Sequence, residues 1–352
     1  MWEIVDYVDK HFREMLDMTT EYYGEDNDIS NGDFVNHEYF LNPAGKAFIK
    51  LAYDKENDCL AGQYIVIPRY YAVNGNVYKT VLSLNTLTRD TYRGQQIFTK
   101  LAEEVYRECA KRKICFCYGA PNPNSFPGFI KKLAFRNMGE IPLYLKITNP
   151  YRLLCDKLHI LSSARKDASD TPLRMPGIRV VEITNENVEY FDQFWGRITR
   201  KYPVLGVRDT GYIRWRYLDM PRRDYKIYMA FKDNLPCGYI IGRISTVANM
   251  RCGMIVDFLV MENMDDVGEA LLKILTRHFK NHKIGLLGCL MQEWSDEAKY
   301  LRKKGFFICP HRLLPQPFPI IFRQFCELQL SDNKIIGDFK KWFFTMGDYD
   351  VI

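Results

Sequence analysis

The pattern of hydrophobic and polar positions in the first 150 residues predicts a unit of mixed α and β structure. Three consecutive segments, residues 47–53, 62–71 and 77–87, are rich in β-branched and aromatic residues and are predicted strands. The pair Asn74-Gly75 separates the last two segments and is a strong signal for a tight hairpin turn. Shorter apolar segments predict further strands in this unit, at residues 2–8, 114–118 and 141–147.

Helices are predicted where apolar positions recur at helical spacing. Ile97, Leu101, Val105 and Cys109 lie four residues apart with polar residues on the other face, which predicts an amphipathic helix over residues 97–112. The segment of residues 24–33 is acidic and rich in glycine and asparagine, which predicts a loop. Further helices are predicted over residues 10–23, 34–41 and 126–134, and from residue 150 to about residue 161.

The second half of the chain repeats this order of elements. Predicted strands cover residues 179–183, 226–231, 237–244, 253–260 and 284–290, and predicted helices cover residues 188–199, 267–279 and 296–304. Three pairs of landmarks lie at nearly constant offsets of 178, 174 and 171 residues: Ala52 and Ala230, Gly94 and Gly268, and Phe135 and Phe306. This near-constant spacing indicates an internal duplication.

A change of character after residue 148 marks the predicted domain boundary. We expect a first domain over residues 1–148, a helix and polar linker over residues 149–177, and a second domain over residues 178–352. The chain of 352 residues is long enough for two hydrophobic cores. The second domain ends in an apolar and aromatic tail, which we expect to pack into a groove.

Composition and charge narrow the class of protein. Hydrophobic residues make up 47% and charged residues 26%, as in ordinary globular proteins, and the net charge of +6 is too mild to indicate a nucleic-acid partner. No run of about eighteen apolar residues occurs, so we expect no membrane span and a cytoplasmic protein. The ten cysteines form no regular framework and are expected to be reduced. His278 and His282 have a metal-compatible spacing but no third ligand, so no metal site is expected.

Arg93 and Gly94 stand between a predicted strand and a predicted helix. The first turn of a helix leaves backbone N–H groups without partners, and the helix dipole adds about half a positive charge there. A glycine lets a ligand approach the backbone closely, and an arginine adds charge. The segment therefore predicts a pyrophosphate pocket over residues 94–99, with a plain helix entry as the alternative.

With its flanking elements, this segment resembles the coenzyme A loop of the GNAT N-acetyltransferase superfamily, whose signature is Gln/Arg-x-x-Gly-x-Gly/Ala. Arg93 matches the first position, whereas Gln96 and Phe98 stand where the signature has small residues. The order of elements is similar over residues 1–147 and, less closely, over residues 178–325. The resemblance implies an α/β fold of two tandem domains, each with a mixed, mostly antiparallel central sheet flanked by helices.

The resemblance also implies roles for single residues, with acetyl-CoA or another acyl-CoA as co-substrate. The family often has a tyrosine that protonates the leaving thiolate, but that position holds Ile130 here, and Tyr118 or Ser125 is the candidate substitute. The residues implied to hold the coenzyme are Thr86, Leu87, Thr88, Arg93, Gly94, Gln95, Gln96, Ile97, Phe98, Thr99 and Asn124.

The second half lacks the loop. Its matching helix begins with Asp265-Asp266, and two acids there repel a pyrophosphate, so we expect the coenzyme in the first half alone. A base must take a proton from the acceptor ammonium, and the candidates are Asp90, Asp257, Asp348 and Asp350.

A basic and aromatic run is the candidate acceptor site. Arg214, Trp215 and Arg216 would bind an anionic acceptor, and the alternative is a helix with Trp215 in the core. We expect an N-acyltransferase that acts on a small-molecule amine, with an amino sugar of surface-polysaccharide synthesis as the preferred acceptor. The alternatives are a catalytically inactive binding or scaffold protein of the same fold and an aminoacyl transferase of peptidoglycan-bridge type. The sequence does not indicate the oligomeric state.

Overall fold

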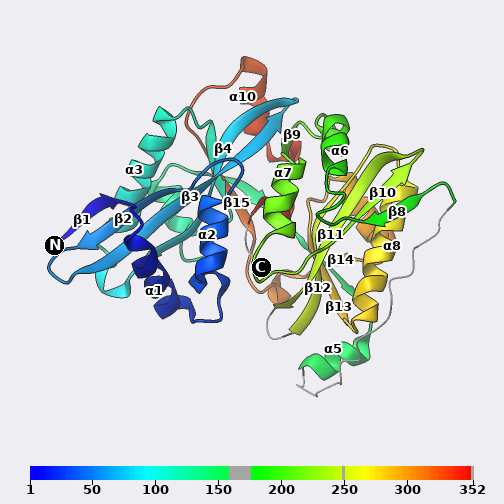
Figure 1. The fold of residues 1–352 in the computed structure, drawn as a ribbon, viewed down its shortest axis with the longest axis horizontal. Helices are drawn as coiled ribbons and strands as arrows, with labels where there is room; N and C mark the ends of the chain where they lie inside the picture. The colour runs from blue at the N-terminus through cyan, green and yellow to red at the C-terminus, as the bar shows by residue number, and fades with distance from the viewer. Residues whose placement is uncertain (158–175, 248–249, 350–352) are drawn as a thin grey trace. The chain divides into compact units, whose positions relative to one another are not determined.

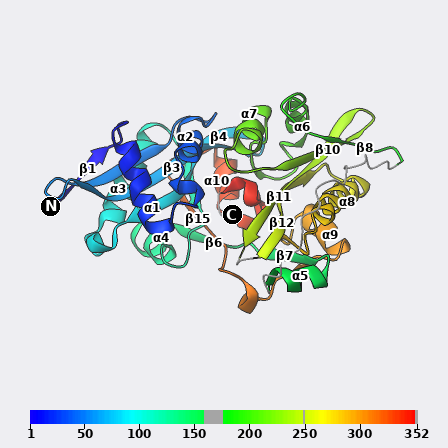
Figure 2. The same ribbon diagram turned by 60° about the horizontal axis from the view of Figure 1, so that its bottom comes forward.

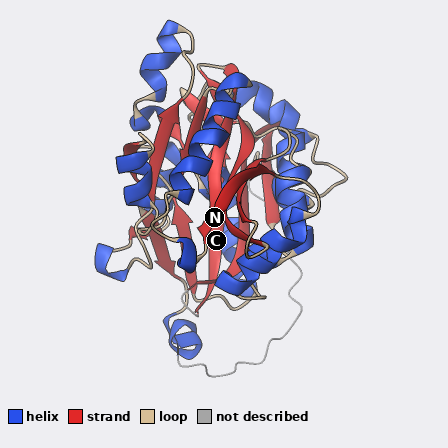
Figure 3. Cartoon of the chain, turned by 90° about the vertical axis from the view of Figure 1, so that its left-hand side faces the viewer, coloured by secondary structure: helices blue, strands red, loops and turns tan. Residues whose placement is uncertain are grey.

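The computed structural model describes residues 1–157, 176–247 and 250–349, and the chain divides into two compact units. The first unit comprises Met1–Glu140, Asp219–Arg222 and Phe318–Phe339, and the second comprises Ile141–Leu218, Arg223–Pro317 and Lys340–Ile352. Each unit has its own sheet with helices against it (Figure 1, Figure 3). The expected fold class, two tandem α/β domains with mixed, mostly antiparallel sheets, is confirmed.

Seven strands form the main path of the first unit's sheet, in this spatial order: β1 (Trp2–Asp6), β2 (Phe48–Asp54), β3 (Cys59–Val73), β4 (Asn76–Thr88), β5 (Phe116–Gly119), β15 (Pro319–Gln324) and β6 (Arg136–Glu140). Neighbours from β1 to β4 are antiparallel, β5 is parallel to β4, and β15 is antiparallel to both of its neighbours. Asn74 and Gly75 have φ angles of 48° and 84°, which confirms the predicted hairpin turn between β3 and β4.

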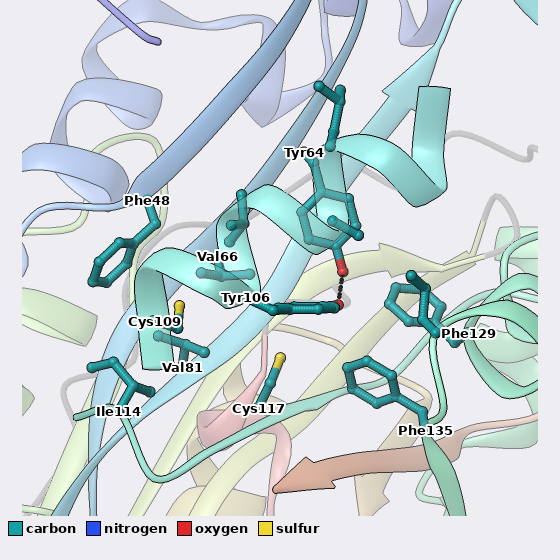
Figure 4. Packing of buried hydrophobic residues seen from close by; sticks show 14 of the residues in the cluster. Phe48, Tyr64, Val66, Val81, Tyr106, Cys109, Ile114, Cys117, Phe129 and Phe135 are labelled. Atoms are coloured by element: carbon teal, nitrogen blue, oxygen red, sulfur yellow. Dashed lines mark hydrogen bonds between the residues drawn. The ribbon is translucent and has the colours of Figure 1, made fainter. Parts of the chain in front are cut away.

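Helices cover both faces of the first sheet. α1 (His11–Tyr23) and α2 (Gly32–Phe40) lie over one face, and α3 (Ile97–Lys111) and α4 (Phe126–Lys132) lie over the other (Figure 1, Figure 2). The predicted stripe of α3 is buried and packs with strand residues such as Val66 and Val81 (Figure 4). Each fully buried aliphatic side chain of this kind contributes about 1.5–3 kcal/mol, so the stripe fixes α3 on the sheet.

The second unit's sheet repeats the order of the first: β8 (Arg179–Glu182), β10 (Lys226–Lys232), β11 (Leu235–Val247), β12 (Met250–Val260), β13 (Leu286–Leu290), β7 (Leu143–Ile147) and β14 (Phe307–Ile308). β12 and β13 are parallel, as β4 and β5 are, and α8 (Asp265–Asn281) connects them as α3 connects β4 and β5. The two units therefore share one topology, which agrees with the duplication inferred from the sequence.

Each half of the chain contributes one strand to the sheet of the other half. β7 follows the first unit's β6 in the chain, yet it pairs with β13 and β14 in the second sheet. β15 follows the second unit's β14, yet it pairs with β5 and β6 in the first sheet. The sheets therefore divide the chain differently from the predicted boundary at residue 148, and residues 141–147 do not close the first sheet as expected.

Several shorter elements were not predicted, among them β6, β14 and β15. The helix α5 (Pro150–Lys157) begins where predicted, whereas its expected continuation to residue 161 and most of the expected linker lie outside the described residues. In the ranges that the structure describes, no helix is long and apolar enough to cross a membrane. The other helices and strands are α6 (Tyr190–Ile198), β9 (Val204–Gly206), α7 (Thr210–Ile213), α9 (Asp296–Lys303), α10 (Leu330–Ile336) and β16 (Trp342–Phe343).

One buried carboxylate on α10 holds the β3–β4 hairpin. Asp332 is 1% exposed and accepts hydrogen bonds from Asn74 Nδ2 (2.8 Å), Asn76 Nδ2 (3.3 Å) and the Tyr78 hydroxyl (2.8 Å). Burial alone would raise the pKa of Asp332, but the hydrogen bonds led by Tyr78 outweigh it and lower that pKa. The same contact and burial raise the pKa of Tyr78 to about 12.

Replacing Asp332 with asparagine is expected to destabilise the fold in a pH-dependent way. Because the folded-state pKa of Asp332 lies below its unfolded value of about 4, its contribution is present above that pH and is lost as the pH falls through the folded-state pKa. At pH 7 the free energy of unfolding should fall by about 1–3 kcal/mol, the usual range for hydrogen bonds to a charged group. Urea denaturation should show the two proteins converging toward pH 3, and an equal difference at both pH values would contradict this account.

Candidate functional site

The parallel pairing between β4 and β5 is short. It joins Val81 to Cys117 and Leu82 to Tyr118, and no further pair of these strands is found among the described residues. β4 nevertheless continues to Thr88 along its other neighbour, β3. The β3–β4 register shifts in this region, and Asn85 has a φ of 49°. β4 therefore has an unpaired edge from Ser83 onward, which is the splay expected for a cleft that receives an extended ligand.

The turn from β4 into α3 exposes main-chain amides. Gly94 has a φ of 83° and Gln96 a φ of 62°, and the Gln96 side chain does not cap the helix. The first helical hydrogen bond is donated by Lys100 to the Gln96 carbonyl. Within the part of the chain that the structure describes, the N–H groups of residues 94–99 find no acceptor. Unpaired amides at the positive end of a helix dipole are the arrangement that favours an anion.

No side chain covers this site at Gly94. A Cβ atom built on Gly94 would meet no atom within 4 Å, so the backbone there is open to a ligand. Arg93 lies beside it with 57% of its side chain exposed, paired with Asp90 Oδ1 at 2.6 Å and hydrogen-bonded to the Tyr22 hydroxyl. An exposed ion pair contributes at most about 1 kcal/mol, so a phosphate can replace Asp90 as the partner of Arg93.

Phe98 stands at a signature position for a small residue, and its side chain points away from the amides. The Phe98 ring lies against Gly128, where an added Cβ would be 3.0 Å from the ring. The centroids of the Phe98 and Phe129 rings are 5.2 Å apart. The Phe98 ring centroid is also 5.7 Å from that of Tyr64. Phe98 therefore fixes the start of α3 against α4, and its backbone N–H is what it offers to an anion.

The matching opening in the second unit is filled by the chain's own tail. β12 and β13 pair as far as Ile255 and Cys289, and the pairing then ends. Phe344 N donates to Gln292 Oε1 (2.8 Å) just beyond β13, and Thr345 Oγ1 donates to Asp257 Oδ1 (3.1 Å) on β12. The predicted groove for the apolar tail thus lies between the ends of these two strands.

A buried ion network holds the tail in that place. Arg208, Asp257 and Asp348 have fully buried side chains, and the guanidinium donates to Asp257 Oδ2 at 2.8 Å and to Asp348 Oδ2 at 2.6 Å. The Tyr217 hydroxyl also donates to Asp257, at 3.1 Å. Because these contacts occupy the carboxylates of Asp257 and Asp348, the structure does not support either residue as a catalytic base.

The start of α8 carries two acidic residues in its first turn, Asp265 and Asp266. The N–H groups of Val267 and Gly268 donate to the Met264 carbonyl, and Val267 N also donates to Asp266 Oδ1 at 2.9 Å, so these amides are already occupied. Asp265 pairs with Lys303 at 2.7 Å, and the hydrogen bond from Lys303 lowers the pKa of Asp265. Neither α3 nor α8 has a side-chain cap among the described residues, but α8 begins with two carboxylates and α3 has no acidic residue in its first turn.

Two predicted substitutes for the missing tyrosine acid occupy different environments. Tyr118 is fully buried, and its ring lies 5.2 Å from that of Tyr71, so the structure does not support it as an acid. Ser125 lies at the start of α4, where its hydroxyl donates to Asn122 Oδ1 at 3.1 Å. Asn124 is exposed in the same turn. Thr86, Leu87 and Thr88 lie on the part of β4 that has no pairing with β5.

The predicted acceptor residues are mostly internal to the second unit. Trp215 and Arg216 are each 4% exposed, and Arg216 donates to the Tyr225 hydroxyl (3.3 Å) and the Tyr349 carbonyl (3.4 Å). Arg214 is partly exposed and pairs with Glu189 at 3.6 Å. The structure therefore does not support Trp215 and Arg216 as acceptor-binding residues. Trp215 instead packs in the core, which was the alternative prediction.

The remaining base candidates are Asp90 and Asp350. Asp90 is exposed and paired with Arg93, and Asp350 lies outside the described residues. The structure instead brings Glu38 of α2 to the irregular part of β4. Glu38 is 2% exposed, and Asn85 Nδ2 donates to its Oε2 at 3.4 Å and to the Tyr39 hydroxyl at 2.7 Å. No local sequence signal marks Glu38, because its role depends on where β4 bulges.

Cavities occur elsewhere on the first unit as well. One of about 480 Å³ is lined by Phe48, Lys50, Glu104, Glu108 and Arg112, among others. Its α3 residues belong to the second half of that helix, so it does not include the amides at the helix start. Its mixed acidic and basic lining already forms internal ion pairs, such as Lys50 with Glu108 at 3.4 Å.

Comparison with known proteins agrees with the geometry. Residues 4–136 match the family model described as an acetyltransferase (GNAT) domain. No curated protein matches the chain. The matched range contains β4, the residue 94–99 turn, α3 and β5, which together form the opening described above.

Solved structures with low sequence identity share the fold. A GCN5-related N-acetyltransferase from Anabaena variabilis aligns with a TM-score of 0.66 and 11% identity over 93% of this chain and 73% of its own. A probable N-acyltransferase from Enterococcus faecalis aligns with a TM-score of 0.61 and 13% identity, over 92% and 73%. Saccharomyces cerevisiae N-myristoyltransferase with bound myristoyl-CoA aligns with a TM-score of 0.60 and 12% identity, over 91% and 82%.

The buried network predicts that Asp257 supports the fold and leaves the first-unit site unchanged. Asp257→Asn should lower the free energy of unfolding by about 3 kcal/mol, because breaking a buried pair leaves Arg208 with less compensation. The affinity of the folded protein for acetyl-CoA should stay within about twofold, a change below 0.5 kcal/mol. Denaturation and calorimetry on Asp257→Asn and on Asp265→Asn, an exposed control, check both statements. Unchanged stability would refute the structural role of the network.

Proposed function

We propose that this chain, whose residues 4–136 match the acetyltransferase (GNAT) domain model, is an acyl-CoA-dependent N-acyltransferase. The observation that carries the proposal is the conjunction of uncapped amides at residues 94–99 with the unpaired edge of β4. The yeast enzyme of the same fold was solved with myristoyl-CoA, which supports acyl-CoA as the co-substrate.

The donor would lie along the first unit's opening. The amides of residues 94–99 would hold the pyrophosphate, with Arg93 supplying charge beside it. The pantetheine arm would run along the β4 edge past Thr88, Leu87 and Thr86, and Asn124 would contact the arm from the opposite side. The thioester would then lie where the β4–β5 pairing ends, next to Leu82 and Ser83.

The acceptor in this proposal is a primary amine, and Glu38 is the base. An ammonium must lose one proton before its nitrogen attacks the thioester carbonyl, and a buried carboxylate beside the bulged strand can take it directly or through one water. Backbone N–H groups on the unpaired edge of β4 stabilise the oxyanion that forms. The main argument for an amino sugar as the acceptor was binding by Trp215 and Arg216. Both residues are buried, so that argument does not hold.

Charge at Gly94 is expected to control donor binding. Asparagine and aspartate have the same shape and both tolerate a positive φ, so the pair Gly94→Asn and Gly94→Asp isolates the effect of one negative charge. In calorimetry with acetyl-CoA, the aspartate variant should bind at least about tenfold more weakly than the asparagine variant, a difference of about 1.4 kcal/mol. The difference should shrink at high salt. Equal affinities would show that no phosphate lies at this turn, and no binding by the unsubstituted protein would favour the scaffold alternative.

Removal of the proposed base should affect turnover and leave donor binding unchanged. Glu38→Gln is expected to lower kcat by about 10²–10⁴, the usual contribution of a general base, with the acetyl-CoA Kd unchanged. The assay follows thiol release against a panel of amines that includes amino sugars, polyamines and peptides, with and without charged RNA. Asp332→Asn serves as a control for loss of a buried carboxylate. An unchanged kcat in Glu38→Gln would remove Glu38 from the mechanism.

A further inference from the structure

A serine stands at the point where the β4–β5 pairing ends. Ser83 is the first β4 residue beyond the Leu82–Tyr118 pair. The residue facing it on β5 is Gly119, where an added Cβ would lie 3.3 Å from the Ser83 carbonyl oxygen and 3.6 Å from its Cβ. Because Gly119 has no side chain, β5 can lie this close to Ser83 without a clash. Ser83 is 9% exposed, whereas Leu82 before it is 2% exposed.

The Ser83 hydroxyl belongs to a chain of three buried hydroxyl groups. Its Oγ lies 3.0 Å from the Tyr64 hydroxyl on β3, which in turn is hydrogen-bonded to the Tyr106 hydroxyl on α3 (Figure 4). Tyr64 is fully buried and Tyr106 is 3% exposed. The surrounding side chains, such as Cys117 and Phe129, are apolar. Buried hydroxyl groups in such a core are costly unless they are hydrogen-bonded, so the chain is a connected unit.

The side chain of Tyr106, at the other end of this hydroxyl chain, lines a cavity. This cavity of about 300 Å³ is also lined by Arg107, Arg323 and Phe325, among others. The Arg323 guanidinium lies 4.9 Å from the centre of the Tyr106 ring. The three side chains that carry these hydroxyl groups thus extend from the end of the β4–β5 pairing to a cavity on the same unit.

We propose that Ser83 protonates the leaving thiolate and that Tyr64 and Tyr106 resupply its proton. This inference rests on the proposed acyl transfer. When the tetrahedral intermediate collapses, the C–S bond breaks, its electron pair goes to sulfur, and the Ser83 hydroxyl gives sulfur its proton. Ser83 takes the Tyr64 proton, Tyr64 takes the Tyr106 proton, and Tyr106 takes one from water in the cavity. The proton lost by the acceptor nitrogen goes to Glu38 and then to solvent, where it neutralises the hydroxide left by the water that reprotonates Tyr106, so protons balance.

The protonation states fit these roles. Burial raises the pKa of both the Tyr64 and the Tyr106 hydroxyl, so both carry a proton at neutral pH. Ser83, Tyr64 and α4 lie on the same side of the sheet, since Tyr64 and Phe129 share one core cluster. No hydroxyl side chain occurs within α4 itself, whose sequence is FPGFIKK. Ser83 is the catalytic residue of this scheme, and Tyr64 and Tyr106 act through it as positioning residues.

The test uses hydroxylamine as the acceptor, because it is neutral at pH 7 and does not need Glu38 to remove a proton before attack. Ser83→Ala should lower kcat by about 10², the lower end of the range for a general acid, and leave the acetyl-CoA Kd within twofold. Ser83→Thr should keep most activity, and Tyr64→Phe should lower kcat by about tenfold. Thr80→Val is the matched control, because Thr80 is a fully buried hydroxyl on the same strand that donates to the Arg69 carbonyl (3.2 Å) outside the chain.

A solvent isotope effect separates chemistry from packing. The unsubstituted enzyme should show a normal deuterium effect on kcat that falls toward unity in Ser83→Ala and stays in Thr80→Val. Equal losses of kcat in Ser83→Ala and Thr80→Val, or a loss confined to Kd, would overturn the role of Ser83 while acyl transfer still stands. An unsubstituted protein that does not bind acetyl-CoA, or binds it without turnover, would overturn acyl transfer and this inference together.

Discussion

The candidate site depends on where one parallel strand pair ends. β4 stays paired with β3 up to Thr88, so it cannot follow β5, and the β4–β5 pairing stops after Leu82 and Tyr118. The edge of β4 beyond that point keeps its hydrogen-bonding groups, and the chain then turns into α3 with its first amides uncapped. An extended ligand with an anionic end can bind both features at once, and this geometry is the physical basis of the proposed donor site.

The same topology occurs twice, and the two copies differ in how the opening is used. In the second unit, residues around Thr345 lie between the ends of β12 and β13, held by Arg208. Asp265 and Asp266 place two carboxylates in the first turn of α8, the helix that follows β12. A buried arginine between two carboxylates is a costly arrangement whose loss leaves uncompensated charge, so the tail is a fixed part of that unit. The duplicated fold therefore has one opening filled by protein and one suited to a ligand.

Local sequence patterns predicted the elements well because each signal acts locally. The Asn74-Gly75 turn and the stripe of α3 were read from the sequence, and the structure confirms both. The exchange of β7 and β15 was not predictable in this way, because an apolar strand has the same pattern in either sheet. The three-hydroxyl chain and Glu38 depend on contacts between elements far apart in sequence, and Trp215 and Arg216 showed that a basic and aromatic run can belong to a core.

The most direct test of the central claim is a titration of the ¹⁵N-labelled protein with coenzyme A, followed by NMR through backbone amide shifts. The account predicts that the largest shifts occur at residues 94–99, with smaller shifts along residues 83–88 and none at residues 265–268, the start of α8. Shifts that leave residues 94–99 unchanged, or that are equally large at both helix starts, would contradict the claim that uncapped amides at the start of α3 bind the donor.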